Sequence, residues 1–292
     1  MSTVPAALSP NRLSGFKPAM LLPGAVVTFV LILFALVLVL FLGLRGNDGS
    51  LTGTGFTLDN FSTIVTDPLY WTVTLRSLTI AGLVTLATVV TAYPVAYFLA
   101  FQAGRRRGLI LFLVTLPFWT SYLLRVFAWK IVLAYNGVLN SALMATGITT
   151  EPLMMFLNTP AAVIVTLAHA YAPFAILPIY VALETIPKSL LEAASDLGAK
   201  PFTAFRRVIL PNSMPGVLAA ALVVFVPTVG DYVTPAMVGG PASTMIGSLI
   251  QAQFGKANDW PFGAALAVIV ILVILAVVLI VRMADRRFGS RT

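Results

Sequence analysis

The stretch Phe262–Met283, which reads FGAALAVIVILVILAVVLIVRM, indicates that this chain folds in a lipid membrane and not in water. It contains a single charged residue, Arg282, one position before its end. A helix needs about 20 apolar residues to cross the hydrocarbon core of a bilayer, which is roughly 30 Å thick. This stretch is long enough, so we expect a membrane-spanning helix here.

Five apolar stretches of similar length precede it. Together the six predict spans near residues 20–44, 77–101, 109–133, 160–183, 214–238 and 262–283. Of the 292 residues, 59% are hydrophobic and 10% are charged, whereas about a quarter of residues are charged in soluble domains. No fixed-period repeat or long polar linker divides the chain. We therefore expect an all-α integral membrane protein with one transmembrane domain, residues 1–292.

The first stretch is expected to remain as a span, because the apolar region of a secretory signal has roughly 7–15 residues. Six spans place both termini on one side of the membrane, and cytoplasmic loops carry an excess of Lys and Arg. With the termini inside, inner segments hold 13 of the 18 Lys and Arg residues, outer loops hold 3, and 2 lie in or at the end of the third span. We expect both termini in the cytoplasm.

Composition argues against several functions. The chain has no cysteine and one histidine, His169, so neither a thiol nucleophile nor a cysteine or histidine metal site is expected. The net charge of +8 comes from short basic clusters between apolar stretches, not from a basic face, so no nucleic-acid partner is expected. The G-x-x-x-x-G-K-[ST] phosphate loop is also missing, so energy from ATP must come through a partner.

The loop 184–213 is predicted to form two short helices joined by a glycine turn. Pro187 suits the start of the first helix, Ser189 is a candidate cap, and Gly198 suits the left-handed residue that ends a helix. Pro201 then opens the second helix. The apolar residues of this second helix recur at helical spacing, so one of its faces should be buried. These apolar residues are Phe202, Phe205, Val208 and Ile209. The same pattern also fits an amphipathic hairpin on the membrane surface.

This loop resembles the EAA loop of ABC importer permeases. The matching residues are Glu192, Ala193, Ala194, Gly198, Leu210 and Pro211. Val208 stands where that family usually has Ile, a conservative departure. The resemblance implies the type I ABC importer permease fold. It also implies that the helix–turn–helix docks in a cleft of a cytoplasmic ATPase and transmits the closure of that ATPase to the spans.

Two further segments, 116–125 (LPFWTSYLLR) and 230–235 (GDYVTP), resemble the spermidine/putrescine branch of these permeases. The resemblance implies a non-catalytic subunit in a bacterial inner membrane that imports a polyamine or related cation. The implied partners are membrane lipid, an ATPase dimer, a second similar permease chain, most simply a heterodimer partner, and an extracytoplasmic solute-binding protein. No cofactor is expected in this chain, because ATP and Mg²⁺ would be bound by the ATPase.

An ionisable group within a span marks a candidate functional site, and Asp231 and Arg125 are the candidates here. Asp231 lies between Gly230 and Pro235, so the fifth span should be broken there, and such a break at membrane depth must be buried in protein or line a cavity. Asp231 is a candidate contact for a cationic amine. It equally fits a cap on a half-helix or a pair with Arg125, which is itself a candidate gate.

Aromatic residues add candidates for the solute path. Trp119 and Tyr122 near Pro117, and Tyr232 beside Asp231, offer faces that bind organic cations. Aromatic belts at the membrane interface account for the same residues. His169 is expected to be a hydrogen-bonded packing residue. Glu184 should end the fourth span, either joining the coupling loop or facing water.

Three alternatives remain open from sequence. A permease of this family for iron, phosphonate or an amino-acid derivative would share the same scaffold. An ion-coupled secondary transporter would need more intramembrane acids and no docking loop. A membrane enzyme would need a metal cluster, a nucleophile with its base, or paired carboxylates.

Overall fold

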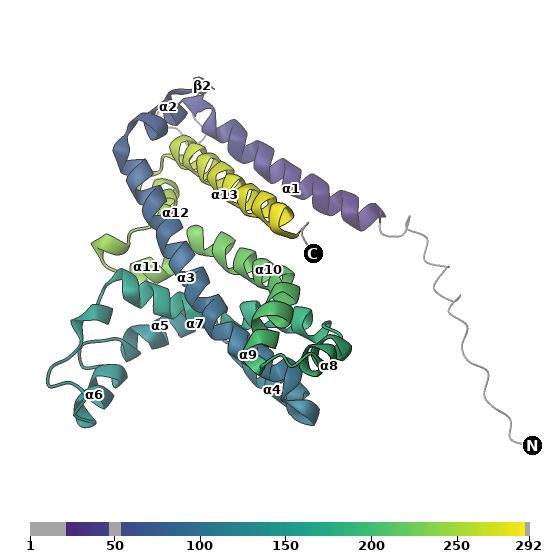
Figure 1. Cartoon of the computed structure of the whole chain (residues 1–292). Helices are drawn as coiled ribbons and strands as arrows, with labels where there is room; N and C mark the ends of the chain where they lie inside the picture. The colour runs from purple at the N-terminus through teal and green to yellow at the C-terminus, as the bar shows by residue number, and fades with distance from the viewer. Residues whose placement is uncertain (1–21, 47–53, 290–292) are drawn as a thin grey trace, which may run out of the picture.

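The computed structural model describes residues 22–46 and 54–289 (Figure 1). Five long helices dominate: α1 (Leu22–Gly43), α3 (Pro68–Phe101), α7 (Pro160–Glu184), α10 (Leu210–Val229) and α13 (Trp260–Gly289). The shorter helices are α2 (Asp59–Thr66), α4 (Arg107–Thr115), α5 (Tyr122–Val132), α6 (Val138–Ala145), α8 (Lys188–Asp196), α9 (Pro201–Ala204), α11 (Val233–Val238) and α12 (Ile246–Ala252). Two short strands, β1 (Arg45–Gly46) and β2 (Thr54–Phe56), pair antiparallel.

The core is a bundle of α3, α7 and α10, which pack on one another along their lengths. Small side chains let these helices approach closely, as is usual where helices associate in lipid. At Gly216 of α10, an added Cβ atom would lie 2.4 Å from the Cβ of Ala182 and 2.6 Å from the carbonyl oxygen of Pro178, both on α7. Leu167, Ile179 and other side chains buried in this bundle complete the core.

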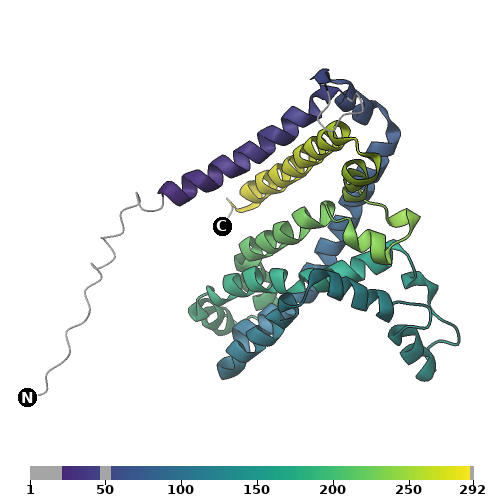
Figure 2. The ribbon, with the colours of Figure 1, turned by 180° about the vertical axis from the view of Figure 1, so that it is seen from behind.

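A second layer is the antiparallel pair of α1 and α13, which lie side by side in both views (Figures 1 and 2). The end of α1 meets the beginning of α13, because a Cβ added at Gly43 would lie 3.0 Å from the Cα of Ala265. Most described side chains of α1 are exposed and apolar, which suits a helix surrounded by lipid. The start of α1 and the end of α13 therefore lie at one end of the molecule.

The expected third span, 109–133, is not one straight helix. It divides into α4, a 3₁₀ turn at Leu116–Trp119, and α5, and the two halves meet at 90°. Pro117 lacks an N–H donor, and the backbone of Thr120 is extended, so the helical hydrogen bonds stop there. Phe118 holds the bend against Phe174 of α7, with ring centroids 5.2 Å apart. The described chain thus has five continuous candidate spans, and six when the bent pair counts as one.

Two other helices begin before the spans that were expected in them. Helix α3 begins at Pro68, well before the expected residue 77, because Asp67 caps it by accepting the N–H of Leu69 at 2.8 Å. The helix that contains the fifth span begins at Pro201, ahead of the expected residue 214, since α9 continues into α10 through a π-helical turn at Phe205–Ile209. That wider turn stands directly before Pro211, which cannot donate a backbone hydrogen bond.

The segment 45–76 contains a short helix, α2. Asn60 holds α2 against the end of α1, since its Nδ2 donates to the carbonyl oxygens of Gly43 at 3.2 Å and Arg45 at 2.8 Å. Helix α2 also packs on α13. The β1–β2 hairpin beside it was not expected from the sequence.

Candidate functional site

The loop between α7 and α10 forms the expected helix–turn–helix. Helix α8 starts at Lys188 after an extended Pro187, and Gly198 has φ +76°, the left-handed conformation that only glycine adopts without strain. Pro201 opens the second helix, as expected. The expected cap, Ser189, was wrong: it lies inside the first turn of α8, and Pro187 occupies the cap position.

The residues that carry the family motif lie on an accessible surface. Glu192, Ala193, Gly198 and Pro211 are exposed, and Ala194 and Leu210 are half-buried. Beside them stand two exposed apolar side chains, Leu197 at 89% and Phe202 at 73% of their full exposure. Leu197 and Phe202 form a bare apolar surface of the kind that marks a protein contact.

The other face of the second helix is anchored to the bundle. The Phe205 ring packs edge-on against Tyr93 and Tyr97 of α3, with ring centroids 5.8 Å and 6.2 Å away. The hydroxyl of Tyr93 lies 2.8 Å from the Oγ of Ser213, which belongs to α10. A force applied to the loop therefore reaches both α3 and α10.

An ion pair of Glu184 connects the end of α7 to the start of the bent span. Glu184 is the last residue of α7, and its carboxylate accepts a hydrogen bond from the guanidinium of Arg107, the first residue of α4. Both side chains are substantially exposed, so this ion pair orients the two helix ends and contributes less than about 1 kcal/mol of stability.

The break expected in the fifth span is present between Val229, the end of α10, and Val233, the start of α11. Asp231 lies in the break and is only 8% exposed. Its Oδ1 accepts the backbone N–H of Val233 at 3.0 Å, and its Oδ2 accepts the hydroxyl of Tyr122 at 2.8 Å. That hydroxyl also lies 2.7 Å from the Oγ1 of Thr234. Asp231 therefore holds the first residue of α11 and fastens that helix to α5.

Arg125 is not the partner of Asp231. Its guanidinium donates to the carbonyl oxygen of Ala170 at 3.1 Å and, more weakly, to that of Thr120 at 3.5 Å. In the part of the chain that the structure describes, its Nε is buried without a hydrogen-bond partner. Arg125 thus ties α5 to the middle of α7 and to the bend.

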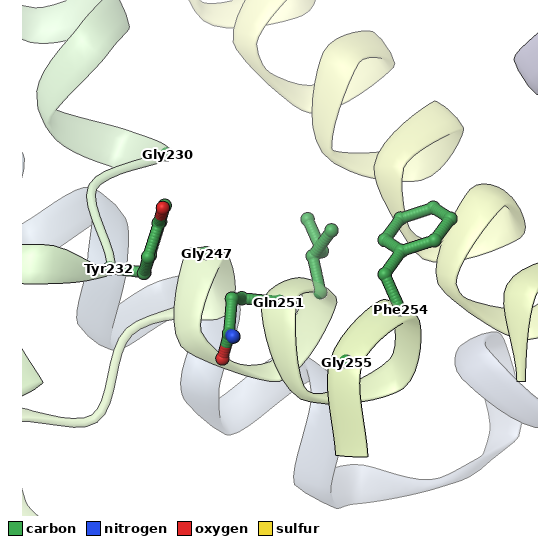
Figure 3. A pocket seen from close by; sticks show the side chains of 7 residues that line it. Gly230, Tyr232, Gly247, Gln251, Phe254 and Gly255 are labelled. Carbon is green, nitrogen blue, oxygen red and sulfur yellow. The ribbon is translucent and has the colours of Figure 1, made fainter. Parts of the chain in front are cut away.

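Tyr232 lines a separate hollow of about 470 Å³, of which Asp231 is not part (Figure 3). The residues that line this hollow are Gly230, Tyr232, Gly247, Ile250, Gln251, Phe254 and Gly255. Trp119 is 78% exposed at the bend in the third span and takes no part in the Asp231 network. The structure therefore brings Asp231, Tyr122 and Thr234 together and leaves Tyr232 and Trp119 apart from them.

Sequence reasoning missed Gln251 and Phe254. A usable signal was present, because residues 247, 251, 254 and 255 recur at the spacing of one helical face. That face packs on the break, since a Cβ added at Gly247 would lie 2.3 Å from the carbonyl oxygen of Gly230. Ser77 of α3 fixes α12 there, as its Oγ accepts the N–H of Ile246 at 2.7 Å.

His169 is a hydrogen-bonded packing residue, as expected. Its Nδ1 accepts the indole N–H of Trp129 at 3.1 Å, and the two rings pack edge-on. Across residues 22–46 and 54–289, no group of three or more His, Cys, Asp or Glu side chains is placed to hold a metal ion.

We expect Tyr122→Phe to loosen the junction of α5 and α11. The change removes the donor to Asp231 and leaves a buried carboxylate oxygen short of one hydrogen bond, which costs about 1–3 kcal/mol. Thermal unfolding of the detergent-solubilised protein measures this loss. Tyr135→Phe is the matched control, because that ring is half-exposed in the turn between α5 and α6, and equal losses in both variants would contradict the assignment.

A bundle of membrane-spanning helices with a broken span and an accessible, anchored helical hairpin defines the transmembrane subunit of a transporter. Residues 92–290 match the family described as "Binding-protein-dependent transport system inner membrane component", and this chain belongs to that family. The resemblance to ABC importer permeases is thereby confirmed.

Curated relatives span most of the chain. The spermidine/putrescine transport system permease protein PotB of Escherichia coli (strain K12) is 40% identical over 248 residues, covering 85% of this chain and 90% of that protein. PotB of Haemophilus influenzae is 38% identical over 248 residues, covering 84% and 86%. A chain in the crystal structure of a bacterial alginate ABC transporter with its alginate pentasaccharide-bound periplasmic protein shares the fold, with TM-score 0.70, 19% identity, and 92% and 93% coverage.

Proposed function

We propose that this chain is the transmembrane subunit of an ATP-driven importer for spermidine, putrescine or a related polyamine. The observation that carries the proposal is 40% identity to a spermidine/putrescine permease along nearly the whole of both chains. The chain itself catalyses no reaction in this scheme. A separate cytoplasmic ATPase dimer binds and hydrolyses ATP with Mg²⁺.

The proposed assembly contains a second, similar permease chain and an extracytoplasmic solute-binding protein. The bare apolar surface at Leu197 and Phe202, next to the exposed Glu192, supports docking of the ATPase at α8 and α9. Closure of the ATPase on ATP would push Phe205 against α3. Helix α10 would move with α3, because Tyr93 of α3 is hydrogen-bonded to Ser213 of α10. The change from inward-facing to outward-facing is then a population shift driven by ATP binding.

We also propose six crossings with both termini in the cytoplasm, counting the bent pair of α4 and α5 as one. The end of α1 and the start of α13 both lie near α2, and α3 leads from there to the basic segment 104–107. The start of α1 and the end of α13 therefore lie at the end where the basic residues and α8 gather. An excess of Lys and Arg favours the cytoplasmic side for that end.

The test is ATP hydrolysis by the assembled transporter in nanodiscs. This chain is co-expressed with the ATPase and the second permease encoded beside it, and the binding protein is added empty or loaded with spermidine. We expect the loaded protein to stimulate hydrolysis several-fold over the empty one. Stimulation only by a different solute would contradict the polyamine assignment and leave the importer class standing.

A further inference from the structure

The hollow beside Tyr232 has the construction of a small-molecule site. Its volume of about 470 Å³ falls in the range of roughly 300–1,000 Å³ that ligand sites occupy. One wall is the unwound backbone at Gly230, and the other is the face of α12 and the π-helical turn Gln253–Ala257 that follows it (Figure 3). Non-helical backbone at membrane depth is tolerated where it lines a cavity or is buried in protein, and here it lines this hollow.

The chemistry of the lining favours a cation with an apolar body. Gly230 borders the hollow directly after the carboxyl end of α10, where aligned peptide dipoles produce a partial negative charge, and the amino ends of the shorter helices α11 and α12 border it as well. Gln251 contributes an amide oxygen, and Tyr232 and Phe254 contribute aromatic rings that attract ammonium groups and cover methylene groups. Lys256, the nearest basic residue along the chain, does not line the hollow.

Asp231 is poorly placed to serve as the first contact. Both of its carboxylate oxygens already accept hydrogen bonds, from Val233 and Tyr122, and the side chain is 8% exposed. Tyr232, the next residue, is 47% exposed and faces the hollow. The break thus separates a structural carboxylate on one side from an accessible aromatic ring on the other.

We propose that the hollow formed by Tyr232, Gln251 and Phe254 is a solute site of this permease and holds a flexible chain ending in an ammonium group. The ammonium lies at the Gln251 amide and the end of α10, and the methylene chain lies against the two rings. Asp231 holds the break in shape without touching the solute. This inference rests on the proposed import of polyamines.

The absence of cysteine in this chain permits a direct test. Gln251→Cys places a single thiol of this chain in the hollow, and Ala257→Cys places one on the same segment at an exposed position outside it. Each variant is assembled with its partner chains in nanodiscs and treated with a neutral methanethiosulfonate reagent. The labelled fraction of this chain is followed by intact mass.

We expect putrescine to slow labelling at position 251 by about fivefold and to leave labelling at position 257 unchanged. Butane-1,4-diol, which has the same length without charge, should protect neither. Gly255→Cys provides a second thiol in the hollow should the glutamine be needed for assembly, because a Cβ there points at the Gln251 amide, 3.3 Å from its Nε2.

If the unmodified complex imports polyamine but putrescine protects neither the thiol at 251 nor the thiol at 255, the proposed site is wrong and the proposed function stands. Protection by the diol as strongly as by the diamine would overturn the cation assignment. If the unmodified complex neither imports a polyamine nor responds to one, the proposed function itself fails.

Discussion

Replacing Gly216 with valine is expected to prevent the transmembrane bundle from assembling. The first added carbon already falls 2.4 Å from the Cβ of Ala182 and 2.6 Å from the carbonyl oxygen of Pro178, so the backbone of α7 would have to move. Overpacking of a core costs typically about 1–3 kcal/mol even when side chains can adjust, and here a backbone atom stands in the way. We expect a loss above about 3 kcal/mol, seen as loss of monodisperse protein in size-exclusion chromatography.

Gly82→Ala is the matched control in a neighbouring helix. An added Cβ at Gly82 of α3 meets nothing within 4 Å, and alanine favours a helix over glycine by about 1 kcal/mol. This variant should therefore be as stable as the unmodified protein or slightly more so. Equal behaviour of the two variants would show that α7 and α10 do not approach as closely as described.

Gly198→Pro is expected to abolish solute-stimulated ATP hydrolysis while the permease still assembles. Proline fixes φ near −65°, which is incompatible with the φ of +76° at this turn, so α8 and α9 cannot keep their relative orientation. Among the described residues, apart from its two chain neighbours, no atom lies within 4 Å of a Cβ added at Gly198, so the damage should stay within the loop. We expect a loss of tenfold or more in stimulated hydrolysis in nanodiscs.

Two further variants distinguish the need for a left-handed backbone at residue 198 from general damage caused by a substitution. Gly198→Asn should retain much of the activity, because asparagine tolerates the left-handed conformation better than most residues. Gly108→Ala, at the same end of the molecule in α4, should behave like the unmodified protein, since its Cβ meets nothing within 4 Å. Full stimulation in the proline variant would refute the coupling role of this loop.

The approximate place of the long apolar helices could be predicted from composition, because each apolar stretch alone is long enough to cross a bilayer. Their ends could not. Asp67 extends α3 outward by capping it, and α9 runs into α10 because a π-helical turn accommodates Pro211. The bend in the third span depends on how Phe118 packs against Phe174, a contact between distant segments that hydrophobicity does not encode.

The candidate site was predictable where backbone rules apply. Gly198 and Pro201 mark the turn of the coupling loop, and the glycine and prolines around Asp231 mark the break. The partners of Asp231 were not predictable, because Tyr122 reaches it only through the bend in the third span. Gln251 joins the hollow only because Gly247 lets α12 lie against Gly230.

The pairing of α1 with α13 bears on how the protein is made. The ribosome delivers the amino-terminal segment first, and α13 leaves it last, so α1 enters the membrane long before its neighbour exists. Until α13 is made, lipid covers the face of α1 that later contacts α13. The almost uniformly apolar surface of α1 is compatible with that contact with lipid. A thiol placed on α1 opposite α13 should become shielded from a lipid-soluble reagent only after translation of α13 is complete. The α1–α13 pair can therefore form only after α13 has been synthesised.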